Sequence, residues 1–505
     1  MYQFIFFTDL VDTIYVAKTI GAYKCAHTLR SAGYSVLVID HLHTFDEIEL
    51  KELLNKAISD QTLAVGFSAT FFKNTNVPIN PDGSITYTNL PGNTFFPQGK
   101  QVEDSVVSHI KQLNPNCKIT LGGTTVTQHY QNKNIDYAFI GYSEASIVNL
   151  ANHLYKKTDL THSMKNIWGT VIIDDRKAES YDFQNSGFRW LKEDVVNARS
   201  LPIEIARGCI FKCKFCAFSM NGKQNLDFIK NVELLRTELQ DTYDRFGVTT
   251  YSIIDDTFND NDYKLNIILE AIKKLTFQPK FWAYTRLDLM ATKKHIDILY
   301  DIGVRAFYFG IETLNKQTGK IIGKGHSPQS QINTIQELRA KFGNTITMHG
   351  SFIIGLPGES IESVTNTFNL IQDGTIPLHS FDFKTLFIDN ANLVNWSSDI
   401  SKNYTSYGYT AVGDTNNLSI AWKNDHMSQI EAKELENTFR QQSQNSDRFY
   451  MPGQPAWALA NYGYDLPTLM NTLHRDAPWH EFTQHKNNFI QSYKKQLFEI
   501  IASQI

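Results

Sequence analysis

Three cysteines lie close together near the middle of this 505-residue chain, in the segment IEIARGCIFKCKFCAFS. Cys209, Cys213 and Cys216 follow the spacing Cys-x-x-x-Cys-x-x-Cys. Three thiolates on one short loop can ligate three irons of a [4Fe–4S] cube, which leaves the fourth iron without a protein ligand. Small molecules can bind and react at such an open metal position. The spacing therefore predicts an iron–sulfur cluster with one corner open to chemistry.

Zinc is the other metal that such cysteines could bind. Zinc usually takes four ligands, commonly from two short pairs. The sequence holds no second cysteine pair, and the nearest histidine downstream of the three cysteines is His295. The remaining cysteines, Cys25 and Cys117, stand alone, and we expect both to be small buried apolar side chains.

Composition favours a globular protein of two or three domains. The chain is 42% hydrophobic and 20% charged, and its formal net charge is -4. This balance gives no electrostatic reason to expect a nucleic acid or an anionic membrane as partner, so we expect a small-molecule or peptide substrate. No apolar run reaches the ~18 residues of a spanning helix, and the start MYQFIFFTDL is unlike a signal peptide. Clustered cysteines and these features predict a cytoplasmic protein.

Residues 1–160 alternate short apolar runs with helical patterns, which predicts an α/β domain of the Rossmann type with a parallel sheet. The expected strands are residues 3–10, 34–42, 63–72, 117–126 and 135–144, and the expected helices are residues 17–33, 46–59, 102–114 and 145–157. The stretch 73–100 is rich in Asn, Pro, Gly and Thr and interrupts the alternation as a lid or a short hairpin.

Small and polar residues follow the strands of this first domain. Ligands of open parallel sheets bind beyond the carboxyl ends of the strands, so these positions are candidates for a bulky ligand. A structural domain with ordinary strand-end turns would give the same pattern, and the pattern alone does not decide between them. The strand ends are Thr8–Asp9, Ser68–Thr70, Gly122–Gly123–Thr124 and Tyr142–Ser143.

A second strand–helix series fills residues 201–390, after a linker at 161–200 that contains one strand, IWGTVIID. Six such units predict a complete or partial (β/α) barrel, whose chemistry sits at the carboxyl ends of the strands. Residues 391–505 are expected to form a mainly helical cap on one side of the barrel, with helices near 428–445, 465–474 and 484–503. The expected barrel strands are residues 202–207, 249–255, 280–286, 306–312, 346–355 and 380–388.

The cysteine loop resembles the signature of the radical S-adenosylmethionine (SAM) superfamily. The loop directly follows the first barrel strand, as that family requires, and the resemblance covers roughly residues 200–390. In the family, the aromatic residue before the third cysteine packs near the adenine, and Phe215 occupies that position. The resemblance implies that Cys209, Cys213 and Cys216 hold a [4Fe–4S] cluster that binds SAM.

The other barrel strand ends agree with this resemblance. Asp255 and Asp256 could hold the ammonium of the cofactor, although Asp256 or Asn259 could instead cap the next helix. Arg286 suits the methionine carboxylate, with a surface salt bridge as the alternative.

The fourth and fifth barrel strands end in two further candidates. Glu312 follows an apolar run, so we expect it to be half-buried and in need of a partner. In related enzymes a polar residue at this place touches the ribose or the amino-acid end of the cofactor. The segment GSFIIGLPGE resembles the adenine-binding segment of the family, which points to Ile354 and Gly355.

The resemblance implies a reaction as well as a set of cofactors. A reduced cluster gives one electron to SAM, and the resulting 5′-deoxyadenosyl radical abstracts hydrogen from a substrate. Such an enzyme needs an external one-electron donor such as a flavodoxin or a ferredoxin. The protein binds and orients the reactants and excludes water and oxygen.

A Rossmann-like domain ahead of this barrel resembles the cobalamin-binding radical SAM enzymes. The likeness rests on GAYKCAHTLRSAGYSVLVID, VGFSAT, LGGTT and DYAFIGYSEASIVNL. It implies that cobalamin is bound by Ser68, Thr70, Gly122, Gly123, Thr124 and Tyr142. The string Asp-x-His-x-x-Gly, which supplies a lower ligand in other cobalamin domains, does not occur here, although radical members often lack it.

The leading hypothesis is cobalamin-dependent methyl transfer to an unactivated carbon. The alternatives are a radical rearrangement, cyclisation or oxidation without methyl transfer, and a non-catalytic sensor that binds a cluster or a corrin. Methylthio transfer uses a second cluster, which Cys25 and Cys117 cannot supply. Aromatic residues of the cap could line a substrate pocket, but at this density they more often build a core. They are Tyr404, Tyr407, Tyr409, Trp422, His426 and Trp457.

Overall fold

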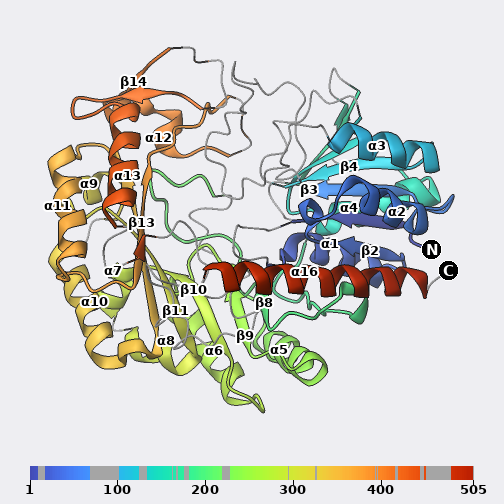
Figure 1. The fold of residues 1–505 in the computed structure, drawn as a ribbon, viewed down its shortest axis with the longest axis horizontal. Coiled ribbons are helices and arrows are strands. Elements are labelled where there is room, and N and C mark those ends of the chain that lie inside the picture. Colours follow the sequence, from blue (N-terminus) through green and yellow to red (C-terminus); the bar gives the residue numbers. More distant parts are fainter. Residues whose placement is uncertain are drawn as a thin grey trace.

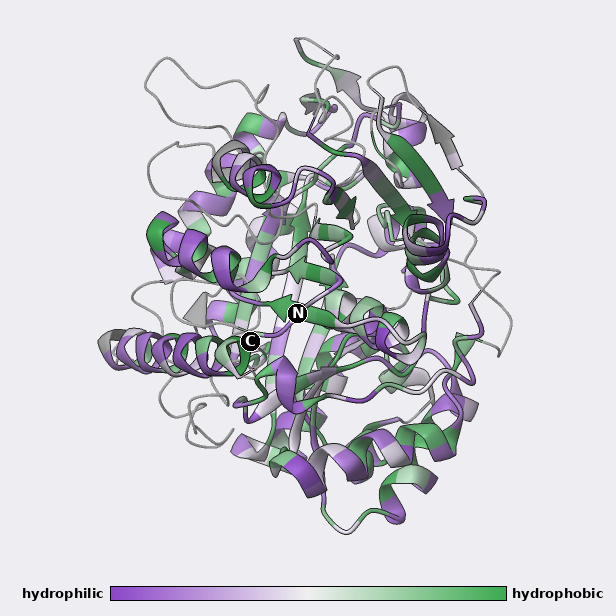
Figure 2. Cartoon of the chain, turned by 90° about the vertical axis from the view of Figure 1, so that its right-hand side faces the viewer, coloured by the Kyte–Doolittle hydropathy of each residue, from purple (hydrophilic) through white to green (hydrophobic). Residues whose placement is uncertain are grey.

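The computed structural model describes residues 1–9, 17–68, 102–123, 134–161, 163–165, 169–175, 181–218, 228–293, 295–324, 327–392, 394, 396–413, 415, 419–443, 449–450 and 479–503. Two sheets with helices against them form its two halves, and the last helix crosses from one half to the other (Figure 1). The interior strands are mostly apolar, whereas many helices alternate between apolar and polar residues (Figure 2).

The first sheet has the strand order β2-β1-β3-β4-β5-β7-β6 within the described residues. All neighbouring pairs are parallel except β6 and β7. Its strands are β1 (Phe4–Phe7), β2 (Val36–Ile39), β3 (Ala64–Ser68), β4 (Lys118–Gly122), β5 (Tyr137–Gly141), β6 (Ser163–Lys165) and β7 (Val171–Asp175). Its helices are α1 (Ile20–Ser31), α2 (Glu47–Ala57), α3 (Val102–Leu113) and α4 (Glu144–Lys156).

Alternate strand residues point to two different cores, which is why these strands read as continuous apolar runs. Phe4 and Phe6 pack on the side of α1 and α4, whereas Ile5 and Phe7 pack on the side of α2 and α3. Helix α2 begins with a capping box, in which the side chain of Asp46 accepts from the backbone N–H of Glu49. The Rossmann-like domain predicted for this region is confirmed.

The one strand predicted in the linker at 161–200, IWGTVIID, corresponds to β7, and the short β6 was not predicted. Strand β7 belongs to the first sheet, where it pairs in parallel with β5 and antiparallel with β6. The buried Ile172 and Ile173 explain this placement, because an apolar strand next to a sheet edge lowers its exposed apolar area by joining it.

The second sheet has the order β16-β13-β12-β11-β10-β9-β8 within the described residues, and all its neighbours are parallel. The six predicted barrel strands are confirmed, and the short β16 was not predicted. The strands are β8 (Ser200–Ile203), β9 (Thr250–Ile253), β10 (Lys280–Thr285), β11 (Val304–Glu312), β12 (Thr347–Ile354), β13 (Ser380–Thr385) and β16 (Phe449–Tyr450). The helices are α5 (Val232–Phe246), α6 (Asp262–Lys273), α7 (Leu287–Lys293), α8 (Ile296–Ile302), α9 (Lys316–Ile321), α10 (Pro328–Phe342) and α11 (Ile361–Gln372).

Local signals in the sequence set the ends of these helices. Asn231 and Asn261 cap α5 and α6 by accepting backbone N–H groups with their side chains. Gly247 ends α5 with φ of 67°, a left-handed conformation that glycine adopts without a Cβ clash. Each helix therefore returns the chain to the start of the next parallel strand.

The C-terminal region is partly a cap on the barrel and partly an arm to the first domain. Its described elements are α12 (Asp399–Lys402), β14 (Thr410–Ala411), β15 (Trp422–Lys423), α13 (Gln429–Ser443) and α16 (Trp479–Ala502). Phe439 of α13 stacks on Phe368 of α11 with ring centroids 4.2 Å apart, so α13 covers the barrel as expected. The predicted helix at 465–474 and Trp457 lie outside the described residues.

The last helix corrects the expectation that the whole region from 391 to 505 caps the barrel. Helix α16 lies against the first domain (Figure 1), where Tyr493, Leu497 and Ile501 are buried in the same core as Leu53. These three residues recur every four positions and form one apolar stripe, which α2 covers. Lys494 adds an ion pair with Glu49 on α2.

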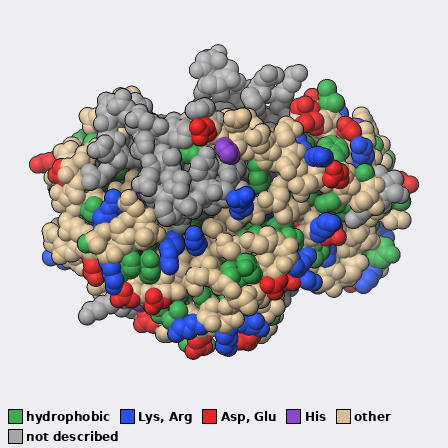
Figure 3. Space-filling model, turned by 60° about the horizontal axis from the view of Figure 1, so that its bottom comes forward, with side chains coloured by type: hydrophobic (Ala, Val, Ile, Leu, Met, Phe, Trp, Pro, Cys, Tyr) green, Lys and Arg blue, Asp and Glu red, His purple; other side chains and the backbone are tan. Residues whose placement is uncertain are grey.

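Among the described helices, none has a stretch apolar and long enough to span a bilayer. Lys and Arg side chains are interspersed with Asp and Glu side chains on the face in Figure 3. This mixture agrees with the composition of 48 basic and 52 acidic residues.

Candidate active site

The cysteine loop follows β8 at the carboxyl end of the barrel sheet. Cys209 is buried, Cys213 and Cys216 are half-buried, and none of the three forms a disulfide bond. The main chain of Lys214, in the middle of the loop, donates to the carbonyl of Ile322 at 3.0 Å and accepts from Ile400 at 2.8 Å. The loop is therefore fixed by backbone contacts to the end of α9 and to α12 that do not involve the thiols.

Two side chains from neighbouring strands reach the thiols. Thr257 Oγ1 lies 3.4 Å from Cys209 Sγ, and Arg286 Nη1 lies 3.4 Å from Cys213 Sγ. The guanidinium of Arg286 thus places a positive charge beside the thiol of Cys213. Burial raises the pKa of Cys209, the most enclosed of the three. Phe215, predicted to lie near the adenine, is half-buried against the main core.

No three His, Cys, Asp or Glu side chains of the described chain converge on a point where one metal ion could sit. The thiolates of a cube anchored at three corners each bind a different iron, so they surround a group of atoms instead of meeting at one point. The chemistry of the donor set, three cysteines outside any disulfide on one loop with a cation beside Cys213, fits a cluster.

Arg286 already has a carboxylate partner in this structure. Its guanidinium forms two hydrogen bonds with Asp288, at 3.0 and 2.7 Å, and its carbon lies 3.8 Å from the ring centre of Phe211 in the cysteine loop. The salt bridge considered as the alternative is therefore present, but it is buried and not on the surface. The position of Arg286 as a ligand for a methionine carboxylate stays a prediction.

The two aspartates after β9 differ in their surroundings. Asp255 Oδ1 accepts from the backbone N–H groups of Ile205 and Ala206, at 2.8 and 2.9 Å, and Oδ2 lies 3.5 Å from Lys264 Nζ. The prediction that both carboxylates hold an ammonium therefore fits Asp256 better, because Asp255 is occupied in joining β9 to the chain after β8. Burial, followed by the charge of Asp255, raises the pKa of Asp256 to about 7.

The alternative that Asp256 or Asn259 caps the next helix is wrong, since Asn261 caps α6. Asn259 instead joins two strand ends. Its side chain accepts from the N–H of Arg286 at 2.8 Å and donates to the carbonyl of the same residue at 2.9 Å. These bonds fix the main chain from which the Arg286 side chain reaches Cys213.

Glu312 has the burial and the partner that its sequence context required. Its carboxylate lies 3.3 Å from Lys324 Nζ, which also donates to the carbonyl of Gly310. Its φ of 66° is in the left-handed region, at a point where the register of β11 against β12 shifts. Non-glycine residues in that region are strained, and such strain is concentrated at functional sites.

The end of β12 is enclosed by the C-terminal region. Gly355 has φ of 94°, and a Cβ added there would lie 2.2 Å from Trp422. Tyr409 donates to the Gly355 carbonyl at 2.7 Å, and the N–H of Leu386 donates to the carbonyl of Ile354 at 2.8 Å. Trp422 and Tyr409 are buried, so these two cap aromatics build a core, as expected.

Glu359, four residues further on, should make stability depend on pH. Burial raises the pKa of Glu359 from its ordinary value of 4.5 to about 8. The folded protein keeps this proton where the unfolded chain has lost it, so the stabilisation is complete below pH 4.5 and is lost as the pH rises toward 8. The natural chain should therefore lose unfolding free energy, relative to Glu359→Gln, by up to about 1.4 kcal/mol per pH unit as the pH rises across this window. Urea unfolding at several pH values measures the difference, and parallel curves for the two proteins would contradict it.

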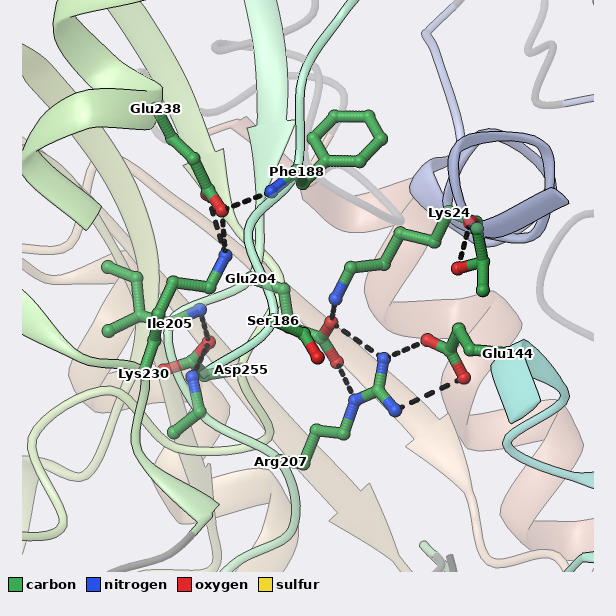
Figure 4. A network of polar contacts seen from close by, with 12 residues as sticks. Lys24, Glu144, Ser186, Phe188, Glu204, Ile205, Arg207, Lys230, Glu238 and Asp255 are labelled. Carbon is green, nitrogen blue, oxygen red and sulfur yellow. Dashed lines mark hydrogen bonds and ion pairs between the residues drawn. The ribbon is translucent and has the colours of Figure 1, made fainter. Parts of the chain in front are cut away.

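A buried network of charges joins the two domains just before the cysteine loop (Figure 4). Arg207, two residues ahead of Cys209, binds Glu204 at 2.8 Å and also binds Glu144 at the start of α4. Lys24 of α1 forms an ion pair with the same Glu204. Burial raises the pKa of Glu204, but the charges of Lys24 and Arg207 outweigh it and bring it to about 2. The charges in IEIARGC were the available signal, but their partners lie far away in sequence.

The strand ends of the first domain gather at one edge of the sheet. Ser68 and Gly122 are paired in register on β3 and β4, and among the described residues a Cβ at Gly122 would meet Phe139, at 3.9 Å. Gly123 follows with φ of 119°. Small residues at adjacent strand ends leave the backbone open to a large flat ligand, so these positions fit a corrin. Thr70, Thr124 and the 73–100 stretch lie outside the described residues.

Tyr142, after β5, has a contact that the sequence did not indicate. The centre of its ring lies 4.3 Å from the guanidinium carbon of Arg207. This predicted corrin residue is therefore in direct contact with the segment that leads into the cysteine loop.

The two remaining cysteines are packed as apolar side chains. Cys117 is fully buried and Cys25 packs against the main core. Burial raises the pKa of each thiol to about 12, so neither is poised to bind a metal as a thiolate.

Residues 203–371 match the family model of the radical SAM superfamily. An uncharacterized methyltransferase of Pyrococcus horikoshii is 27% identical over 300 residues, which cover 56% of this chain and 63% of the relative. A bacteriochlorophyllide d C-8(2)-methyltransferase of Chlorobaculum tepidum is 22% identical over 247 residues, which cover 44% of this chain and 53% of the relative. The chain thus spans between half and two thirds of the length of these relatives.

Two solved structures share the architecture over nearly the whole chain. The radical SAM methyltransferase TsrM of Kitasatospora setae, with cobalamin and a [4Fe-4S] cluster bound, has a TM-score of 0.65 at 13% identity and covers 98% of this chain and 100% of its own. The cobalamin-dependent SAM radical enzyme OxsB, with aqua-cobalamin and SAM bound, has a TM-score of 0.63 at 14% identity and covers 100% of this chain and 80% of its own. At this identity the likeness shows a common fold. Residues 203–371 thus form a domain that matches the radical SAM superfamily, within a chain that shares the fold of these two enzymes.

Proposed function

We propose that this protein is a cobalamin-dependent radical SAM enzyme that transfers a methyl group to an unactivated carbon of a small molecule. The observation that carries the proposal is the loop with three cysteines outside any disulfide at the carboxyl end of β8, with Arg286 Nη1 at 3.4 Å from Cys213 Sγ. A Rossmann-like domain, joined by buried ion pairs to the segment before that loop, supports a second cofactor site.

A [4Fe–4S] cluster bound here would supply the electron that cleaves SAM, and cobalamin would supply a methyl group for transfer. Cys209, Cys213 and Cys216 would hold the cluster. Phe215, Asp256, Arg286, Glu312, Ile354 and Gly355 would surround SAM, with Asp255 fixing the strand end behind them. Ser68, Thr70, Gly122, Gly123, Thr124 and Tyr142 would hold the corrin.

The protein contributes charge placement and exclusion of water. The half-buried Asp256 can accept an ammonium, and the buried Arg286 places a positive charge beside Cys213. The cap, through Trp422 and Tyr409, encloses the Gly355 end of the site and so limits the access of solvent. The substrate of TsrM is tryptophan in one solved complex, which agrees with a small-molecule substrate here. An external flavodoxin or ferredoxin would deliver the electron.

Product analysis under anaerobic conditions tests the proposal. The full chain is loaded with iron, sulfide and hydroxocobalamin and incubated with SAM and a chemical reductant. We expect 5′-deoxyadenosine, and S-adenosylhomocysteine only when cobalamin is bound. Formation of 5′-deoxyadenosine alone, with no corrin uptake, would instead favour a radical transformation without methyl transfer. If neither product is formed, the assignment as an enzyme is contradicted.

A further inference from the structure

One face of the barrel sheet is polar and aromatic, unlike the face that packs on the helices. Phe281, Phe307 and Met348 belong to the hydrophobic core, and the residues that alternate with them lie on the opposite face of the sheet. These alternating residues are Trp282, Tyr284, Tyr308, His349, Ser351 and Asp382. Polar and aromatic side chains in a barrel interior indicate a ligand site, whereas a packed core would be apolar.

His349 and Asp382 on this face have polar atoms without hydrogen-bond partners among the described residues. Their exposed fractions are 6% and 2%, and neither His349 Nε2 nor Asp382 Oδ1 forms a hydrogen bond within this part of the chain. The two atoms lie 3.6 Å apart, too far for a hydrogen bond between them. Buried polar atoms nearly always have a partner, so this group calls for one.

The hydrogen bond on the other side of the imidazole suggests what the partner must be. His349 Nδ1 lies 2.8 Å from Ser380 Oγ. In the tautomer whose Nδ1–H donates to Ser380, Nε2 is an acceptor, and the carboxylate of Asp382 is an acceptor as well. A single donor group that lies within hydrogen-bond distance of both acceptors would satisfy them.

Aromatic rings extend from this pair toward the cysteine loop. Tyr308 stacks on His349 with ring centroids 4.7 Å apart, and Tyr284 meets Tyr308 edge-on at 4.8 Å. Tyr284 is 36% exposed, so it is the accessible end of the row. Arg286 follows two residues later on the same side of the chain and reaches Cys213. The row therefore ends beside the place where the cluster would be held.

We propose that His349 and Asp382 bind the N–H or O–H donor of a small aromatic substrate whose ring lies against Tyr284. This inference rests on the proposed function, because it names the class of substrate for the same barrel. The donor atom would lie to one side of the line that joins Nε2 and Oδ1, within hydrogen-bond distance of both, and the aromatic body would point toward the cysteine loop. The observation that carries it is the buried, unbonded pair at one end of an aromatic row that is open at the other end.

The test uses three probes of similar size on the full chain loaded with cluster and SAM. Aniline carries an N–H donor, phenol carries an O–H donor, and toluene carries neither. Dissociation constants are measured by saturation-transfer NMR titration. We expect aniline or phenol to bind at least 10-fold more tightly than toluene, and whichever binds better identifies the donor.

Two variants tie this preference to the pair. Asp382→Asn keeps the shape but offers its own donor to His349, and His349→Phe keeps the ring against Tyr308 but removes Nε2. Each should reduce the preference over toluene to less than 2-fold, while Asp136→Asn, in the first domain, should leave it unchanged. Thermal unfolding shows which variants are folded. One folded variant of the pair is enough for the test.

Equal binding of the three probes to the natural chain would overturn the inference, and so would a preference that survives in a folded variant of the pair. A single ordered water or a closed His–Asp ion pair at this place would give the first of these results. Release of 5′-deoxyadenosine is measured in the same samples. If SAM is cleaved but no preference over toluene exists, the substrate inference fails and the proposed function stands. If a preference exists but SAM is not cleaved, the binding site stands and the proposed function fails.

Discussion

Replacing Cys213 by alanine is expected to abolish cluster binding and to reduce 5′-deoxyadenosine formation to background, while the fold is kept. The thiol is half-buried, and the loop around it is fixed by the main chain of Lys214 to Ile322 and Ile400. Alanine therefore removes one of the three iron ligands and few structural contacts. Iron content, visible absorbance and product formation measure the loss, and circular dichroism checks the fold.

Cys25→Ala is the matched control, because it removes a thiol that packs against the main core and is not part of the cysteine loop. We expect this variant to keep its iron and its activity. If Cys213→Ala still cleaved SAM at a rate comparable to that of Cys25→Ala, the assignment of the cluster to this loop would be wrong.

Replacing Arg207 by methionine is expected to destabilise the folded chain by about 3–5 kcal/mol. The guanidinium is 4% exposed and satisfies two buried carboxylates, Glu204 and Glu144. Its removal leaves Glu144 without this partner, while Glu204 retains Lys24. Urea unfolding measures the change. Because Arg207 links the β5–α4 corner to the cysteine loop, we also expect weaker cobalamin retention during gel filtration.

Two further variants separate the loss of the network from the loss of any ion pair. Glu52→Gln breaks an exposed pair with Lys56 on α2 and should cost less than about 1 kcal/mol. The double variant Arg207→Met/Glu144→Gln should recover part of the lost stability, since it leaves no ionised carboxylate at position 144. A cost for Arg207→Met no larger than that of Glu52→Gln would contradict the structural role of the network.

The sequence was sufficient for the strands that position the site. Apolar runs such as AFYFGI and TMHGSFII predict buried parallel strands. The end of each run identifies the residues that lie at the end of the strand. Cys209 and Arg286 could thus be placed at strand ends, because their neighbours in sequence determine their position. The burial of Glu312 and its need for a partner follow from the same reasoning.

Features that depend on distant contacts could not be predicted. Nothing near Arg207 in sequence indicates that Glu144 of another domain is its partner. The amphipathic pattern of α16 indicates an apolar stripe but not which surface covers it, and α2 of the first domain does so. Asp288 was overlooked as the partner of Arg286, although its position two residues further on was a signal.

Electron paramagnetic resonance of the reduced, iron-loaded protein tests whether the three-cysteine loop holds a cluster that binds SAM. Three protein ligands leave one iron open, so SAM should bind at that iron and change the signal of the cluster. We expect a [4Fe–4S]⁺ signal whose g values shift when SAM is added. Protein that takes up no iron under anaerobic loading, or a cluster signal that SAM leaves unchanged, would contradict it.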